Sequence, residues 1–314
     1  MLREAFAPML LTLTRFLAAL PVLASLAALP AWSASDLQTK AEAAFGHAVG
    51  GAVVMRAADG KVLAVVDPDL ACAQTHPPGS IFKLVTAFAA LEEHLVTPND
   101  HFTCNGWRKL GGMKLNCAIP NGHGRLNLSD AIARSCNVTF YGLGVRLGPE
   151  RIIQYADLLG LGNGCPGYSG QQVRGALPKP PVHPVDIARL AIGQCKGLSI
   201  TVLEAAEMTR RIAIGSVPAR SKSSLAVVRE GMRHAVTSGT CRAAAVKGIA
   251  VAGKTGSTEA PGNEDERDAW FVGFAPYDKP EVIVVVYARR GHGYDKAAPI
   301  AGRILAAYFA RGAR

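Results

Sequence analysis

The chain has 314 residues, of which 49% are hydrophobic, so it can bury a sizeable core in one large domain or two modest ones. Its formal net charge is +10, from 34 basic and 24 acidic residues. This excess could attract an anionic polymer or a membrane surface, but we favour an ordinary basic, solvated surface. The sequence has no block of Lys and Arg and no alternation of aromatic and basic residues, so nucleic acid is not an expected partner.

The N-terminus has the pattern of an export signal. Arg3 and Arg15 precede an apolar stretch over residues 16–32, and the small residues of 31–33 or 33–35 could mark a cleavage site. An uncleaved membrane anchor is the alternative interpretation. The apolar run is barely long enough to span a bilayer and two prolines interrupt it, so we favour cleavage.

The first elements after this segment are a helix and a hairpin. Asp36 can cap the helix, which the glycines at 50 and 51 should end. The apolar stripe of this helix is predicted to comprise Leu37, Ala41, Phe45 and Val49. Two strands, 51–56 and 61–66, should then pair around an Ala-Asp-Gly turn.

The middle of the chain is predicted to be helical, and its end returns to strands. Helices are expected over a short segment capped by Ser129 and then over 138–147, 150–159, 184–192, 201–214 and 224–236. Strands are expected at 248–258, 270–274 and 282–288, with an acidic loop over 259–268 and a last helix over 299–311. Because short connections favour antiparallel pairing, the strands from the two ends should meet in one sheet.

These elements predict an α+β fold of the α/β-sandwich type. A five-stranded antiparallel sheet should be flanked by helices, with an all-helical lobe inserted between its N-terminal and C-terminal strands. We assign residues 1–34 to the signal peptide or N-terminal anchor and residues 35–314 to one functional domain, because no repeat, low-complexity segment or linker divides the latter.

Seven cysteines are typical of a protein exported to an oxidising compartment. Cys104 and Cys117 flank a Gly111-Gly112 turn that should bring them opposite each other, so we predict a disulfide between them. Cys136 is expected to be buried and free. The pairing of the others stays open; they are Cys72, Cys165, Cys195 and Cys241. The absence of a Cys-x-x-Cys pair argues against a zinc site.

Candidate chemistry begins at Pro77-Pro78-Gly79, after which an apolar helix is predicted to start at about Ser80. Lys83 then lies one turn later on the same face. A serine hydroxyl becomes a nucleophile when a neighbour takes its proton, and a buried lysine of lowered pKa can do this. Free backbone N–H groups at the helix start can stabilise an oxyanion. The pair indicates acyl transfer; a capping serine followed by a solvated lysine is the alternative.

Two further motifs favour acyl transfer. Residues 135–137 read Ser-Cys-Asn and residues 254–256 read Lys-Thr-Gly, downstream of the Ser-x-x-Lys of 80–83. This ordered set is shared by penicillin-binding proteins and serine β-lactamases. From about residue 51 to its C-terminus, the chain resembles the penicillin-binding transpeptidase family. The resemblance also covers the flanking residues 77–79, 122–124, 191–194 and 269–276.

The resemblance implies a role for each motif residue on the helical side of the cleft. Ser80 would be the nucleophile and Lys83 its base. Ser135 would relay a proton to the leaving nitrogen, and Asn137 would hold the substrate amide and Lys83. His123 is interpreted as a turn histidine near the site, because the acyl-transfer roles are already filled.

The resemblance also assigns the edge strand. Lys254 would add positive charge that helps to keep Lys83 neutral, and Thr255 would bind the terminal carboxylate of the substrate. Gly256 would let the substrate approach the strand backbone. The backbone N–H groups of Ser80 and Ser257 would form the oxyanion hole.

The implied reaction is acylation of Ser80 by a D-alanyl-D-alanine stem peptide of peptidoglycan, followed by transfer to an amine or to water. A β-lactam would acylate the same serine. A serine β-lactamase of class D type is the first alternative, although class D has Ser-x-Val in place of Ser-x-Asn. A non-enzymatic β-lactam sensor is the second.

The expected partners are the stem peptide, β-lactams and other cell-wall synthesis proteins, with no cofactor and no metal. The resemblance and the N-terminal pattern together predict an exported, periplasmic protein. Contact with the inner membrane is expected only through the N-terminal segment, if that segment stays uncleaved.

Overall fold

The computed structural model describes residues 34–217, 222–260 and 263–310. Residues 1–33, which make up nearly all of the predicted signal or anchor segment, lie outside this range. Among the described residues, no helix has both the length and the apolar character needed to cross a membrane.

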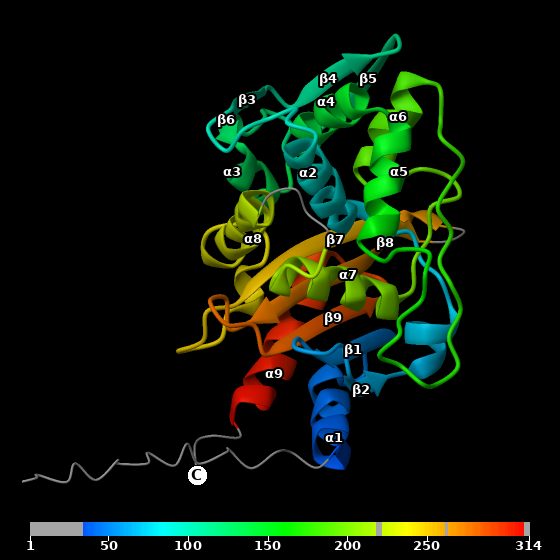
Figure 1. Cartoon of the computed structure of the whole chain (residues 1–314), viewed down its shortest axis with the longest axis vertical. Helices are drawn as coiled ribbons and strands as arrows, with labels where there is room; N and C mark the ends of the chain where they lie inside the picture. Colours follow the sequence, from blue (N-terminus) through cyan, green and yellow to red (C-terminus); the bar gives the residue numbers. More distant parts are fainter. Residues whose placement is uncertain (1–33, 218–221, 261–262, 311–314) are drawn as a thin grey trace, which may run out of the picture. The chain divides into compact units, whose positions relative to one another are not determined.

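A five-stranded antiparallel sheet forms the centre of the described domain and confirms the predicted topology (Figure 1). Its strands lie in the order β2-β1-β9-β8-β7. Their bounds are β1 (Gly50–Arg56), β2 (Val62–Val66), β7 (Ala252–Ala260), β8 (Asn263–Ala275) and β9 (Val282–Ala288). On the central strand, Val285 lies between Val53 of β1 and Val272 of β8, so strands from the two ends of the chain pair directly.

Two hydrophobic cores lie on the two faces of the sheet. Alternate residues of a strand point to opposite faces, so Val284 and Val286 join one core, and Ile283 and Val285 join the other. The first core is covered by α1 (Ala34–Phe45) and α9 (Ala298–Phe309). The second is covered by α7 (Val202–Ile214) and by the inserted lobe.

The inserted lobe is mainly helical and lies at the top of Figure 1. Its helices are α2 (Lys83–Glu92), α3 (Leu128–Ala133), α4 (Asn137–Leu147), α5 (Pro149–Leu158) and α6 (Pro184–Ala191), with α8 (Lys222–Thr237) beside it. The prediction of an all-helical lobe is wrong in one respect, because it also contains two small sheets. They pair β3 (His101–Cys104) with β6 (Gly124–Asn127) and β4 (Trp107–Leu110) with β5 (Met113–Asn116).

Two helix predictions are corrected at their ends. α1 ends at Phe45, and Val49 is 56% exposed rather than part of the buried stripe. Glycines 50 and 51 belong to β1 and do not end the helix. α3 is capped by Asn127, whose side chain accepts from the backbone N–H of Asp130, whereas Ser129 lies inside the helix.

The predicted acidic loop over 259–268 is mostly strand. β7 and β8 continue as one long hairpin, in which Thr258 pairs with Asp268 and Glu259 with Arg267. The Arg267 guanidinium lies 3.0 Å from the Glu259 carboxylate, and such opposite charges stabilise a cross-strand pair. The charged composition suggested a loop, but Glu259 and Arg267 pair across the hairpin.

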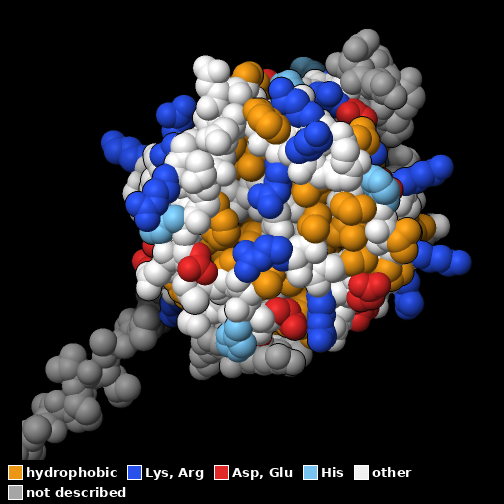
Figure 2. Space-filling view, turned by 90° about the horizontal axis from the view of Figure 1, so that it is seen from above, with side chains coloured by type: hydrophobic (Ala, Val, Ile, Leu, Met, Phe, Trp, Pro, Cys, Tyr) orange, Lys and Arg blue, Asp and Glu red, His pale blue; other side chains and the backbone are white. Residues whose placement is uncertain are grey.

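Basic side chains are spread over the surface of the lobe. Seen from that end, Lys and Arg side chains alternate with neutral and hydrophobic ones and do not gather in one patch (Figure 2). This distribution agrees with the interpretation of the net charge as an ordinary solvated surface.

The buried Glu204 provides a test of how α7 is attached to the rest of the domain. Its carboxylate accepts from the backbone N–H groups of Thr201, Gly164 and Gly175 at 3.0–3.1 Å. Glu204→Ala leaves three donors without an acceptor and should lower the free energy of unfolding by about 3 kcal/mol or more. Urea unfolding measures this. The exposed Glu150→Ala, at the start of α5, should cost less than about 1 kcal/mol, and equal losses would refute the assignment.

Candidate active site

Ser80 lies where the loop at 77–79 turns into α2. Residues Gly79–Phe82 form a 3-10 turn that continues directly into α2, so the predicted helix start is confirmed. Gly79 has a φ of +53°, and a Cβ there would lie 2.5 Å from Thr258 Cγ2 and 2.9 Å from the Ser257 carbonyl. A glycine at this position therefore brings the backbone before Ser80 against strand β7.

Lys83 is fully buried in the first turn of α2. Its Nζ lies 2.8 Å from the Ser135 carbonyl, 3.1 Å from Ser135 Oγ and 2.5 Å from Asn137 Oδ1. Burial, and then the neighbouring charge of Lys254, hold the pKa of Lys83 well below its usual range. This favours the neutral amine, whose lone pair can accept the proton of a serine.

Ser135 lies in the loop between α3 and α4 and joins the two lysines. Its Oγ is 3.1 Å from Lys83 Nζ and 2.9 Å from Lys254 Nζ. Its φ is +56°, a left-handed conformation that costs a serine about 1–3 kcal/mol and that the surrounding structure must hold. Asn137 is the first residue of α4, so the helix start fixes the third member of the motif.

Strand β7 alternates its motif residues between two faces. Lys254 is fully buried toward Ser135 and also donates to the Thr255 carbonyl at 2.7 Å. Burial lowers the pKa of Lys254 to about 8. On the other face, the Thr255 hydroxyl donates to the Thr240 hydroxyl at 2.7 Å. Thr240 carried no motif, so sequence reasoning missed it.

Close packing around Gly256 leaves little room for a side chain at this position. A Cβ there would lie 3.1 Å from the Pro78 carbonyl and 3.2 Å from Ile81 Cγ2, which is tight for any side chain. Gly256 therefore lets the nucleophile turn sit against β7, and its expected role in admitting substrate stays a prediction. The next residue, Ser257, accepts at its Oγ from the Gly293 N–H at 3.1 Å.

A buried aromatic group supports the nucleophile loop from behind. Trp270 on β8 donates its indole N–H to the Pro77 carbonyl at 2.9 Å. His76 stacks on Tyr287 with ring centroids 3.9 Å apart, and Tyr287 donates to the buried Asp268 at 2.5 Å. Trp270 belongs to residues 269–276, one of the segments that carry the family resemblance, but the positions of His76 and Asp268 follow only from the tertiary structure.

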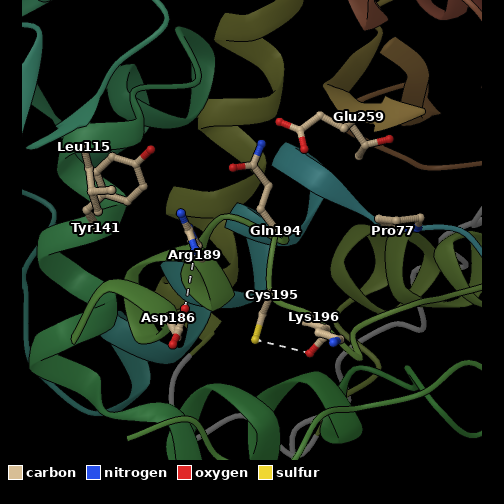
Figure 3. A pocket seen from close by; sticks show the side chains of 10 residues that line it. Pro77, Leu115, Tyr141, Asp186, Arg189, Gln194, Cys195, Lys196 and Glu259 are labelled. Carbon is tan, nitrogen blue, oxygen red and sulfur yellow. Dashed lines mark hydrogen bonds and ion pairs between the residues drawn. The ribbon is translucent and has the colours of Figure 1, made fainter. Parts of the chain in front are cut away.

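A cleft of about 580 Å³ lies beside the nucleophile loop (Figure 3). It is lined by Pro77, Leu115, Tyr141, Asp186, Arg189, Gln194, Cys195, Lys196, Thr258 and Glu259. It is next to Ser80 because Gly193, which precedes Gln194, accepts at its carbonyl from the Gly79 N–H at 3.0 Å. One wall of the cleft is the edge of β7, so an extended peptide could lie along this strand.

The predicted Cys104–Cys117 disulfide is not formed, and all seven cysteines are free thiols in the structure. The Gly111-Gly112 turn does join β4 to β5 and brings the two sulfurs together, as expected. Their sulfurs contact Nδ1 of His123 instead, with Cys136 alongside. The argument against zinc considered only closely spaced cysteines and missed this cluster.

The fold and the three motifs define a serine acyl-transfer domain, with Ser80 in the 3-10 turn that leads into a buried helix and two buried lysines on the hydroxyl of Ser135. Residues 50–306 match the model of the penicillin-binding protein transpeptidase domain. The chain belongs to this family.

Relatives and solved structures agree with this assignment. The chain is 30% identical over 270 residues to stage V sporulation protein D of Bacillus subtilis, covering 74% of this chain and 42% of the relative. It is 28% identical over 283 residues to the peptidoglycan D,D-transpeptidase PbpA of Mycolicibacterium smegmatis, covering 77% of this chain and 57% of the relative. It thus spans about half the length of these relatives.

Among solved structures, PBP2 of Pseudomonas aeruginosa in complex with WCK 5153 superposes with a TM-score of 0.78 at 25% identity. The match covers 87% of this chain and 77% of that one. The five-stranded antiparallel sheet and its flanking helices are therefore the fold of this family.

Lys254→Gln tests the electrostatic link between the two buried lysines. Removing the positive charge beside Lys83 should raise the pKa of Lys83, because less repulsion then opposes its protonation. The acidic limb of the pH profile for acylation by a β-lactam should move to higher pH, and the rate at neutral pH should fall at least about tenfold. Stopped-flow acylation between pH 5 and pH 9 measures this.

The exposed Lys247→Gln serves as the matched charge control, and its profile should equal that of the wild type. An acidic limb at the same pH in Lys254→Gln and wild type would show that Lys254 does not set the pKa of the base.

Proposed function

We propose that this domain is a penicillin-binding serine acyltransferase that acts on D-Ala-D-Ala stem peptides of peptidoglycan through an acyl-enzyme at Ser80. The observation that carries the proposal is the Ser135 hydroxyl, which lies within hydrogen-bond distance of both Lys83 and Lys254. The names of the relatives, several of which are peptidoglycan D,D-transpeptidases, support it.

Acylation begins with Lys83 as the base. A neutral amine donates two hydrogen bonds and keeps one lone pair. With the Ser135 carbonyl and Asn137 Oδ1 accepting the two N–H groups, the lone pair can take the proton of Ser80 as its Oγ attacks the substrate carbonyl. The negative charge then develops on the carbonyl oxygen, for which the N–H groups of Ser80 and Ser257 are the proposed donors.

Collapse of the tetrahedral intermediate needs a proton on the leaving nitrogen of D-alanine. Ser135 is suited to deliver it, because its hydroxyl contacts the lysine that has just been protonated and can be resupplied by that lysine. Lys254 keeps a second positive charge within 2.9 Å of the same oxygen. An amine or water then attacks the ester with the same groups acting in reverse, so the domain transfers the peptide or trims it.

The proposal also covers the substrate site, the location and the partners of the domain. The cleft along β7 is the proposed site for the stem peptide, and β-lactams would enter the same site. We propose that the protein is exported to the periplasm, that it acts with other cell-wall synthesis proteins, and that any membrane contact is made through residues 1–34.

A reporter penicillin tests the acyl-enzyme. Wild-type protein should become covalently labelled at Ser80 and keep the label for many minutes, whereas Ser80→Ala should show none. Gel fluorescence over time and peptide mapping measure this, with release of D-alanine from a stem peptide as the second readout. Rapid turnover of the drug would identify a β-lactamase instead. Stable labelling without release of D-alanine would favour a sensor, and the absence of label would refute the proposal.

Thr255→Val tests the proposed carboxylate site. The hydroxyl of Thr255, which donates to Thr240 in the free domain, would turn to donate to the terminal carboxylate, and losing a hydrogen bond to a charged group costs about 1.5–3 kcal/mol. KM for a peptide ending in a free carboxylate should rise about tenfold or more, with little change for the same peptide amidated at its C-terminus. Steady-state release of D-alanine or D-alaninamide measures both.

The exposed Thr237→Val on α8 is the control and should alter neither KM. A loss of equal size with both peptides would show that Thr255 acts on the structure of β7 and not on the carboxylate.

A further inference from the structure

Two prolines leave the segment before the Ser80 turn short of backbone donors. Pro77 and Pro78 have no N–H group with which to form a hydrogen bond. Just before them, the N–H of His76 donates to the Ile200 carbonyl at 2.8 Å, and the His76 carbonyl accepts from the Ile200 N–H at 2.9 Å. His76 is therefore the point at which the backbone is fixed before the two prolines, and the contacts of its side chain bear directly on the turn that follows.

The His76 side chain is buried and is held on two sides. Its Nε2 lies 3.0 Å from the Leu70 carbonyl. A carbonyl oxygen only accepts hydrogen bonds, so Nε2 carries the proton and donates it. The imidazole also stacks on the ring of Tyr287, with centroids 3.9 Å apart and planes inclined at 19°. The hydrogen bond and the stack together fix both the position and the orientation of the imidazole.

The stack connects this segment to the centre of the sheet. Tyr287 lies on the central strand β9 and pairs directly with Trp270 of β8. Trp270 donates to the Pro77 carbonyl at 2.9 Å, and its ring meets that of His76 edge-on at 6.2 Å. The Tyr287 hydroxyl donates to the buried Asp268 at 2.5 Å, which fixes the outer end of the Tyr287 ring. The aromatic side chains of β8 and β9 therefore hold His76 and Pro77 together.

The imidazole of His76 is neutral at neutral pH. Burial lowers the pKa of His76, against the opposing effect of its hydrogen bond to Leu70. Of the neighbouring charges, that of Arg289 lowers the pKa of His76 and that of Asp268 raises it. His76 therefore acts here through the shape of its ring and its single N–H donor, and not as an acid or a base.

We propose that His76 is a positioning residue for Ser80, because its ring, fixed by β9 and by the Leu70 carbonyl, sets the place of the turn that follows. This role rests on the proposed acyl transfer at Ser80. The 3-10 turn over Gly79–Phe82 begins three residues after His76 and leads into α2. The two intervening prolines have a fixed φ, so they carry a shift of the ring into the turn. His76 thus acts on the position of Ser80 Oγ and not on its proton.

Saturation kinetics of acylation test the positioning role. His76→Ala removes the stack and the hydrogen bond, and should lower the maximal rate constant for acylation by the reporter penicillin at least about tenfold, because misplacing a reacting group by about 1 Å can cost about 100-fold. The dissociation constant of the non-covalent complex should change less than about threefold, since the binding groups on β7 are unchanged. Stopped-flow rates over a range of penicillin concentrations separate the two. An unchanged maximal rate constant, or a loss confined to binding, would overturn the proposal.

His76→Phe is the conservative variant. It keeps an aromatic ring for the stack on Tyr287 but leaves the Leu70 carbonyl without its donor. Its maximal rate constant for acylation should therefore lie between those of His76→Ala and the wild type. A rate constant no higher than that of His76→Ala would show that the stacked ring does not position the turn.

Phe45→Leu is the control for a general loss of stability. Phe45 is buried in the core on the other face of the sheet. Its substitution should lower the free energy of unfolding, measured in urea, while the maximal rate constant for acylation stays within about twofold of the wild type. If Phe45→Leu slowed acylation as much as His76→Ala does, the effect would be one of stability and the positioning role would be refuted.

Amide hydrogen exchange, resolved by NMR, tests the inference without acyl transfer. In the wild type the amides of His76 and Gly79 should exchange at least about 100-fold more slowly than in an unstructured peptide. In His76→Ala the amides of 79–82 should exchange at least about tenfold faster, with exchange in β1 unchanged. Unprotected amides in the wild type would overturn the proposal even if no His76 variant folds. If the wild type forms no acyl-enzyme, the proposed function fails, whereas exchange still decides whether His76 fixes the turn.

Discussion

The site depends on two buried lysines that share one serine hydroxyl. Lys83 and Lys254 are both 0% exposed, and both contact Ser135 Oγ. In the described part of the chain, neither lysine forms an ion pair with a carboxylate. Burying two unpaired positive charges beside each other is costly, so the environment favours loss of a proton from one of them. The fold thus favours a neutral amine at Lys83, at the expense of stability.

The packing of the surrounding domain holds Lys83 and Lys254 close together despite the repulsion between their positive charges. The nucleophile turn, the Ser-x-Asn loop and β7 come from three distant parts of the sequence, and each is fixed by backbone packing. Gly79 and Gly256 let the nucleophile turn touch β7, and the left-handed conformation of Ser135 is held between α3 and α4. Side chains that are locked by their surroundings lose little freedom when substrate binds, which is the condition for pre-organised catalysis.

Sequence reasoning succeeded where local chemistry decides the structure. The β1–β2 hairpin, β9 and the capping box at Thr201 follow from turn residues and periodicity, and the motif residues Lys83, Ser135, Asn137 and Lys254 do lie in contact. It failed where partners come from elsewhere in the chain. The charges of 259–268 suggested a loop, whereas Glu259 pairs with Arg267 on the neighbouring strand, and the contact of Thr240 with Thr255 arises only from the fold.

The cysteine cluster was predicted only in part from the sequence. The turn at Gly111-Gly112 correctly predicted that Cys104 and Cys117 would be close, but no sequence rule placed His123 and Cys136 with them. Cys136 then belongs to two systems at once, since its sulfur faces the cluster while its peptide neighbours contact Lys83. Any force that fixes this sulfur also fixes Ser135 and Asn137 to within one residue. Cys136 is the middle residue of the Ser-x-Asn motif, and its side chain has no proposed part in the acyl transfer. Packing of this side chain inside the lobe can therefore fix the positions of Ser135 and Asn137.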